Sequence, residues 1–244
     1  MTQWIKRLLN RREDRGTLCS AVVPAAGSST RMGGENKLLL PLGDVPVLLR
    51  TLRALDTCPR IHEIVVVTRE DQIVPISQLC QDGCFSKVKC VVTGGASRAE
   101  SVLRGIQAVC PETELIAIHD GARPLVSQTV LDAVIRKAEE CGAAAPAVPV
   151  KDTIKQAVGG VVERTPDRSE LFAVQTPQVF EASLIRGALA KALEEGAQLT
   201  DDCSAVERIG MKVSLTPGEY TNLKITTPED LILAEALLNR RDDR

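Results

Sequence analysis

Along this chain, apolar runs of five or six residues alternate with longer stretches in which apolar residues recur every three or four positions. The short runs predict buried strands, and the longer stretches predict amphipathic helices. Strands are expected at Cys19–Val23, Glu63–Thr68, Val88–Val92, Leu115–His119 and Ala143–Val148. Because strands and helices alternate, we expect a Rossmann-like α/β fold, with a mostly parallel, twisted sheet and helices on both faces.

Capping residues mark the starts of several predicted helices. Ser97 is followed three residues later by Glu100, which is the pattern of a capping box. Ser127 is expected to cap a second helix. The last helix is expected to begin at Thr227-Pro228, because threonine is a good cap and proline is favoured at the first helical position.

One segment, at about residues 150–168, breaks the alternation. Lys151–Val158 and Val161–Thr165 are β-prone and flank Gly159-Gly160, a hairpin turn signal. Much of this hairpin is polar, so we expect an arm that projects from the sheet. A lone two-stranded arm is marginally stable in water, so we expect it to pack on a second subunit in a homodimer.

No linker or repeat divides the chain, so residues 17–244 are interpreted as one domain behind an N-terminal tail, residues 1–16. In the tail, Trp4, Ile5, Leu8 and Leu9 could form one helical face among basic residues. The preferred interpretation is a short helix or a frayed tail. A membrane-touching or targeting segment is the less favoured alternative.

Composition narrows the function classes. Hydrophobic residues make up 44% of the 244 residues, enough for a large core, but aromatic residues make up only 2%. The core must therefore be built from Val, Leu, Ile and Ala. A net charge of −2 argues against a general binder of nucleic acid or membrane surfaces. The scarcity of aromatic rings also argues against stacking on single strands.

Eight cysteines are scattered through the chain without a CxxC pair, and there are two histidines. This pattern predicts free thiols in a reducing compartment rather than a disulfide framework or a zinc site. No secretory signal or membrane-spanning run is visible, so a cytoplasmic location is expected.

The stretch from Ala21 to Leu42 carries the strongest chemical signal. A strand runs into a loop of small residues, Pro24–Gly34, which contains Arg31 and is followed by Lys37. Small residues let backbone N–H groups close on an anion, and a helix expected directly afterwards would add its positive end. Two cations there could neutralise charge that develops on a phosphate under attack. The alternative is a tight turn with two surface cations, since the loop matches neither GxxxxGK[ST] nor GxGxxG.

Ligands of open parallel sheets bind beyond the carboxyl ends of the strands. This rule gathers the loop after the first strand, the turn at Gly94–Ser97 and the turn at His119–Pro124. It brings one group of side chains to a single edge: Arg31, Lys37, Ser101, Asp120 and Arg123. For Asp120 and Arg123 the alternatives are a turn residue and a surface charge. His119 is interpreted as structural, and Lys224 could be a snorkelling surface lysine.

Seven segments in this order give the chain a family resemblance: PAAGSSTRMG, GGASRAESV, HDGARP, VPVKDTIK, FAVQTPQVF, LTDDCSAVE and NLKITTPED. From about Cys19 to Leu238 it resembles the 2-C-methyl-D-erythritol 4-phosphate cytidylyltransferases of the non-mevalonate isoprenoid pathway. The resemblance implies transfer of CMP from CTP to a small polyol phosphate, with release of pyrophosphate. It implies Mg²⁺ held mainly by the CTP phosphates and no covalent intermediate.

The resemblance also implies residue roles. CTP would be held by Ala25, Ala26, Gly27, Gly95 and Ser101. Arg31 and Lys37 would stabilise the transition state at the α-phosphate, and Asp120 would lie near the ribose and the sugar alcohol. The methylerythritol pocket would be lined by Arg123, Thr176 and Thr200. Arg168 and Lys224 would position the attacking phosphate, and Thr153 and Arg168 would reach the partner subunit's site. The chain departs from the family at Leu38, usually glutamine, and at Ala96, an acid in some members.

Three alternatives stay open at this point. A ribitol-5-phosphate cytidylyltransferase would share the fold and the reaction. An NAD-dependent oxidoreductase would need an acid about twenty residues past the glycine loop at the end of the second strand. That position falls in the helical Pro46–Leu55 region, which disfavours it. A non-catalytic nucleotide-binding regulator would have no need of both Lys37 and Lys224.

Overall fold

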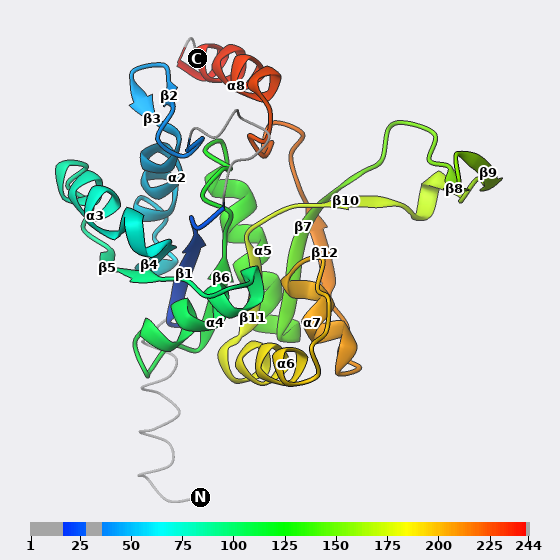
Figure 1. Cartoon of the computed structure of the whole chain (residues 1–244), viewed down its shortest axis with the longest axis horizontal. Coiled ribbons are helices and arrows are strands. Elements are labelled where there is room, and N and C mark those ends of the chain that lie inside the picture. Colours follow the sequence, from blue (N-terminus) through cyan, green and yellow to red (C-terminus); the bar gives the residue numbers. More distant parts are fainter. Residues whose placement is uncertain (1–16, 28–35, 243–244) are drawn as a thin grey trace, which may run out of the picture.

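A computed structural model describes residues 17–27 and 36–242 (Figure 1). Its central sheet contains eight strands: β1 (Cys19–Pro24), β4 (Ile61–Thr68), β5 (Val88–Thr93), β6 (Leu115–Ile118), β7 (Ala143–Pro149), β10 (Phe172–Val174), β11 (Gln178–Glu181) and β12 (Ser214–Pro217). The strand order is β10-β7-β11-β6-β1-β4-β5, and β12 pairs with β7. All five strands expected from the sequence are confirmed, with ends that differ by at most two residues.

The sheet is mixed but mostly parallel, which confirms the expected fold class. β1 pairs in parallel with β4 and β6, β4 with β5, and β7 with β12. β11 lies antiparallel between β6 and β7, and β10 is antiparallel to β7. β10, β11 and β12 were not predicted, because strands of three or four residues are too short to show a period.

Helices cover both faces of the sheet, as expected. One core lies under α2 (Val47–Asp56), α3 (Ile73–Asp82), α5 (Gln128–Cys141) and α8 (Pro228–Asp242). The other lies under α4 (Arg98–Ala108), α6 (Ala182–Glu194) and α7 (Asp202–Arg208). Successive side chains of a strand point to opposite faces, so Ala21 and Val23 enter the first core and Val22 the second. A short 3₁₀ turn, η2 (Glu70–Gln72), precedes α3.

The predicted caps are present, with one difference. Ser127 Oγ accepts from the Val130 N–H at 3.2 Å, and Thr227 Oγ1 accepts from the Asp230 N–H at 3.4 Å. Ser97 Oγ accepts from the Glu100 N–H at 3.1 Å. The Glu100 carboxylate, however, accepts from the Ala96 N–H rather than completing the capping box on Ser97. The carboxylate is thereby used to hold the preceding loop.

The helix expected directly after the small-residue loop is not found in the described residues. A turn from residue 36 leads into a small hairpin, β2 (Pro41–Leu42) and β3 (Val45–Pro46), and α2 begins only at Val47. Two prolines and Gly43, at φ +64°, break the helical path. An NAD-dependent oxidoreductase would end its second strand in this region. Here the region forms the helix α2 instead.

The arm is a separate two-stranded sheet that projects from the body, as predicted (Figure 1). Its strands β8 (Gln156–Val158) and β9 (Val161–Arg164) are shorter than the β-prone runs, and all their residues are exposed. Gly159 and Gly160 form the turn at φ +57° and +81°. The 3₁₀ turn η3 (Arg168–Glu170) leads back to β10. In the described part of the chain, no helix is long and apolar enough to cross a membrane.

Candidate active site

A cavity of about 280 Å³ opens at the carboxyl ends of the parallel strands. The loop after β1, the loop after β5 and the turn after β6 form its walls. Eight of the predicted site residues line it: Ala25, Ala26, Gly27, Lys37, Gly95, Ser101, Asp120 and Lys224. The two departures from the family pattern, Ala96 and Leu38, line the cavity as well. Leu38 also belongs to the apolar core. The sequence rule for the sheet edge therefore located the cavity correctly.

The loop between β5 and α4 is held by the first turns of α4. The Gly95 N–H donates to Ser101 Oγ at 3.0 Å, and Arg104 Nη1 donates to the Gly94 carbonyl at 2.8 Å. A Cβ on Gly95 would lie 2.2 Å from the carboxyl carbon of Glu100, so a larger residue would displace the side chain that accepts from the Ala96 N–H. These bonds fix the loop that lines one side of the cavity.

Asp120, at the end of β6, is surrounded by three cations. Its Oδ2 lies 2.9 Å from Lys224 Nζ and 3.7 Å from Arg123 Nε, and its Oδ1 lies 3.7 Å from Arg98 Nη2. Burial alone would raise the pKa of Asp120, but Lys224, Arg98 and Arg123 outweigh it and lower the pKa to about 2. The carboxylate is therefore ionised at neutral pH. Asp120 can accept hydrogen bonds and orient cations, but it cannot act as a general acid.

His119 is fully buried and forms a structural bridge behind Asp120. Its Nε2 lies 3.1 Å from the Arg123 carbonyl, which can only accept, so Nε2 carries the proton. Its Nδ1 then accepts from the Thr176 hydroxyl at 3.1 Å, and Thr176 Oγ1 accepts from the Asp120 N–H at 3.1 Å. Burial lowers the pKa of His119 to about 4, so the ring is neutral at pH 7. The structural interpretation of His119 agrees with this geometry.

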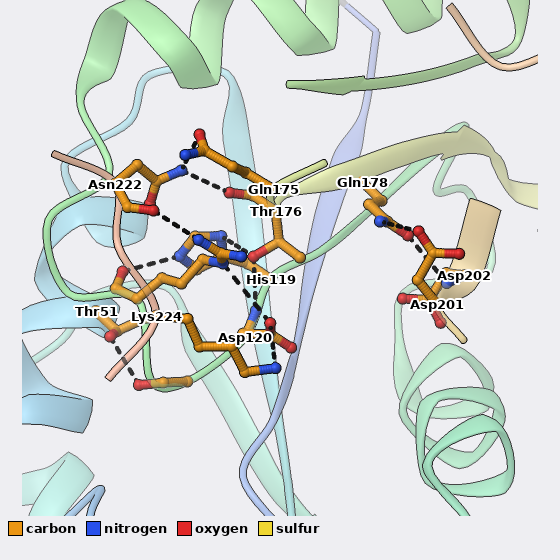
Figure 2. Close-up of polar contacts among 12 residues, drawn as sticks. Thr51, His119, Asp120, Gln175, Thr176, Gln178, Asp201, Asp202, Asn222 and Lys224 are labelled. Carbon is orange, nitrogen blue, oxygen red and sulfur yellow. Dashed lines mark hydrogen bonds and ion pairs between the residues drawn. The ribbon is translucent and has the colours of Figure 1, made fainter. Parts of the chain in front are cut away.

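Lys224 is held over the cavity by the loop that carries it. Asn222 is fully buried, and its Nδ2 donates to the Thr176 carbonyl at 3.0 Å and to Gln175 Oε1 at 3.3 Å (Figure 2). Arg123 Nη1 donates to the Asn222 carbonyl at 2.6 Å. The alternative of a snorkelling surface lysine is not favoured: the Lys224 side chain is 41% exposed, but its ammonium pairs with Asp120.

The remaining predicted residues lie elsewhere. Arg123 and Thr176 contact Asp120 but are not among the described residues that line the cavity. Thr200 is exposed just before α7. Thr153 and Arg168 are exposed on the arm, where Arg168 Nη1 donates to the Lys151 carbonyl at 2.6 Å. Arg31 lies outside the described residues.

Sequence reasoning missed several residues that build the site. Arg98 lines the cavity and pairs with Asp202 of α7, and Thr51 Oγ1 donates to the Gly121 carbonyl at 2.8 Å. Gln178 and Asn222 hold neighbouring backbone groups. Arg98 and Asp202 both fall inside segments that carry the family resemblance. The signal available in the sequence was a charged residue of opposite sign at the start of each of two helices, Arg98 in α4 and Asp202 in α7.

Comparison with known proteins gives one consistent result. The family model for 2-C-methyl-D-erythritol 4-phosphate cytidylyltransferase matches residues 19–240. The enzyme of that name from Desulforamulus reducens is 47% identical over 225 residues, covering 91% of this chain and 96% of its own length. The one from Syntrophotalea carbinolica is 45% identical over 226 residues, covering 91% and 97%.

Solved structures agree. The 4-diphosphocytidyl-2C-methyl-D-erythritol synthase of Anaerococcus prevotii superposes with a TM-score of 0.83 at 33% identity, covering 91% of this chain and 96% of that one. The 2-C-methyl-D-erythritol 4-phosphate cytidylyltransferase of Thermus thermophilus gives 0.75 at 34% identity, covering 89% and 98%. The likeness therefore spans nearly the whole of each protein.

Proposed function

The chain belongs to the 2-C-methyl-D-erythritol 4-phosphate cytidylyltransferase family, and on this premise we propose that it transfers CMP from CTP to the phosphate of 2-C-methyl-D-erythritol 4-phosphate. The observation that carries the proposal is the cavity at the sheet edge. There the small residues Ala25–Gly27 and the glycine loop face Lys37, Asp120 and Lys224. Small residues admit a nucleotide, and cations suit its phosphates.

The chemistry is an in-line displacement. An oxygen of the acceptor phosphate forms a bond to the α-phosphorus of CTP, the bond to the bridging oxygen breaks, and pyrophosphate leaves with that electron pair. Among the described residues of the site, Asp120 is ionised and His119 is neutral, buried and bonded on both ring nitrogens. Catalysis is therefore assigned to positioning and to charge stabilisation.

Lys37 and Arg31 are proposed to stabilise the α-phosphate in the transition state. Lys37 lines the cavity, and Arg31 precedes it by six positions in the sequence, outside the described residues. Lys224 is proposed to position the acceptor phosphate with Arg168. An ammonium has three N–H donors, so its bond to Asp120 at 2.9 Å leaves donors for a phosphate oxygen.

The acceptor's polyol is assigned to the side of the site near Asp120. Thr176 and Arg123 are proposed to shape that side through their contacts with Asp120, because the Thr176 hydroxyl proton is already donated to His119. Thr200, exposed ahead of α7, is proposed to close it.

Mg²⁺ is proposed to be held mainly by phosphate oxygens of CTP. Among the described residues, no group of three His, Cys, Asp or Glu side chains could hold a metal ion. Among the described residues that line the cavity, Asp120 is the one carboxylate, and it is paired with Lys224. This donor set fits a cation that keeps several waters and binds chiefly through substrate phosphates. When bound, Mg²⁺ would neutralise charge on the triphosphate.

A homodimer is proposed because the arm offers an apolar surface. Val158, Val161 and Val162 are 64%, 70% and 54% exposed on the hairpin. The root of the arm is fixed, since the Tyr220 hydroxyl donates to the Pro149 carbonyl at 2.7 Å and Lys151 Nζ lies 3.6 Å from the centre of the Tyr220 ring. A second copy would cover the valines and receive Thr153 and Arg168 at its own site.

A cytoplasmic location is proposed from the thiols. All eight cysteines are free, and Cys19, Cys58, Cys80 and Cys203 are buried. Free thiols persist in a reducing compartment.

The test is pyrophosphate release from CTP with each of two acceptors. We expect turnover with 2-C-methyl-D-erythritol 4-phosphate and a much lower kcat/KM with ribitol 5-phosphate. Removal of divalent cations with EDTA should abolish turnover, and added Mg²⁺ should restore it. A higher kcat/KM with ribitol 5-phosphate would replace the proposed acceptor.

A further inference from the structure

One ion pair joins the wall of the cavity to a second helix. Arg98 is the first residue of α4, and its Nη1 and Nη2 donate to Oδ1 and Oδ2 of Asp202 at 2.8 and 2.7 Å. Asp202 is the first residue of α7, and its side chain is 1% exposed. Two parallel N–H···O bonds fix an angle as well as a distance, which a lysine ammonium cannot do. The pair therefore sets how the N-termini of α4 and α7 lie relative to each other.

The start of α7 is also fixed from the sheet. Gln178, a buried residue of β11, accepts from the N–H groups of Asp202 and Cys203, both at 3.0 Å. Its Nε2 donates to Asp201 Oδ2 at 2.7 Å (Figure 2). Thr200, proposed for the acceptor side, directly precedes Asp201 of this network. A displacement of Asp202 would therefore be transmitted to that side of the site.

Arg98 reaches the reacting region through Asp120. Its Nη2 lies 3.7 Å from Asp120 Oδ1, and Asp120 Oδ2 lies 2.9 Å from Lys224 Nζ. Negative and positive groups thus alternate from Asp202 through Arg98 and Asp120 to Lys224. Because both terminal nitrogens of Arg98 are directed at Asp202 and one also faces Asp120, the guanidinium orients protein carboxylates.

We propose that Arg98 and Asp202 are positioning residues that couple the nucleotide loop Gly94–Ser97 to the acceptor side of the site. This inference rests on the proposed function. A displacement of about 1 Å in a reacting pair can cost ~10²-fold in rate. The variant Arg98→Lys keeps the charge but loses the two-bond geometry. We expect its kcat/KM to fall about 10²-fold, with a raised KM for both substrates.

Stability and positioning are separated by a double variant. Arg98→Gln alone leaves the Asp202 carboxylate buried and unpaired, which destabilises the fold. Arg98→Gln with Asp202→Asn removes both charges, so we expect its Tm to rise above that of Arg98→Gln while kcat/KM stays about 10²-fold below wild type.

Arg60→Lys is the matched control. Arg60 is likewise bonded to carboxylates: its Nη1 donates to both oxygens of Glu139, at 2.8 and 2.9 Å, and its Nε donates to Asp132 Oδ1 at 2.9 Å. It directly precedes β4, at the end of the sheet opposite the cavity. Its kcat/KM should equal that of the wild type. Wild-type kcat/KM in the double variant, or wild-type KM values for both substrates in Arg98→Lys, would overturn the proposal.

The proposed function and the positioning role of Arg98 are tested by different measurements. Absence of pyrophosphate release from the wild-type protein would count against the proposed function itself. The effect on the nucleotide side is measured by calorimetric titration with CTP alone, where Arg98→Lys should bind about tenfold more weakly and Arg60→Lys should bind as the wild type does. Equal affinities for the wild type and Arg98→Lys would count against the coupling.

Discussion

At the residue scale, the charges around Asp120 support the proposal that the site works through cations rather than through acids and bases. Lys224, Arg98 and Arg123 keep Asp120 ionised, and Asp120 in turn holds Lys224 over the cavity. Lys37 enters from the loop after β1 and belongs to the same cavity. Its proposed role depends on charge that appears only as the reaction proceeds.

We predict that Lys37→Ala lowers kcat by about 10²–10³-fold with a much smaller change in the KM for CTP, because an interaction that strengthens in the transition state appears in kcat. Arg31→Ala should behave alike. Steady-state kinetics with varied CTP measure both constants. Lys191→Ala, on the exposed side of α6, is the control and should match the wild type. An effect confined to KM would reassign Lys37 to ground-state binding.

His119 makes stability depend on pH. Its pKa in the folded protein is about 4, below the usual 6.5, so the unfolded chain binds the extra proton first as the pH falls. The contribution of His119 to the free energy of unfolding is therefore fully present above about pH 6.5. It falls by about 3 kcal/mol as the pH falls towards 4. Urea unfolding measures the difference in the free energy of unfolding between pH 7 and pH 4. For His119→Gln this difference should be smaller than in the wild type by about the same amount. His62→Gln, which leaves His119 in place, should keep the full difference.

At the element scale, α4 connects the core to the site. Its first turns hold the glycine loop, and its buried side packs on β1 and β4. Gly105 makes this packing possible, because a Cβ there would lie 2.5 Å from Val22 Cγ1 and 2.6 Å from Val67 Cγ2. Gly187 in α6 offers a contrast, since a Cβ there would meet nothing within 4 Å.

We predict opposite effects of alanine at these two helical glycines. Gly105→Ala should lower the free energy of unfolding by about 1–3 kcal/mol, because the overlap with two buried valines outweighs the gain in helix propensity. Gly187→Ala should raise it by about 0.5–1 kcal/mol, because only the propensity changes. Chemical denaturation measures both. A stabilising Gly105→Ala would show that α4 can move away from the sheet without cost.

At the scale of the whole molecule, the residues proposed for the site are divided between the body and the arm. Lys37, Asp120 and Lys224 line one cavity of the body, whereas Arg168 and Thr153 lie on the projecting arm (Figure 1). Arg168 borders a separate hollow with Lys151 and Phe172. A crossed homodimer would bring the arm of one subunit to the cavity of the other.

This arrangement predicts complementation between two inactive variants. In a mixed dimer of Lys37→Ala and Arg168→Ala, one site carries both lesions and the other carries neither. Random exchange makes half of the dimers mixed, so activity should recover to roughly one quarter of wild type. Pyrophosphate release after verified subunit exchange measures it. A mixture as inactive as its components would place Arg168 in its own subunit's site.

The sequence by itself determined the elements whose signals are local. Apolar runs located five strands, and the hydroxyl caps at Ser97, Ser127 and Thr227 located three helix starts. The rule for parallel sheets then located the edge that holds the cavity. Gly159-Gly160 identified the arm, because positive φ at two successive positions is a property of the residues themselves.

Only the tertiary structure decided which distant groups meet. β10, β11 and β12 are too short to show a period, and their places depend on pairing with β6 and β7. Arg98 and Asp202 are 104 positions apart in the sequence, so no local pattern predicts their pairing. The same holds for Lys224 with Asp120, and for Thr176, whose hydroxyl is turned to His119. Such contacts follow from the register of the whole sheet, which local propensity does not specify.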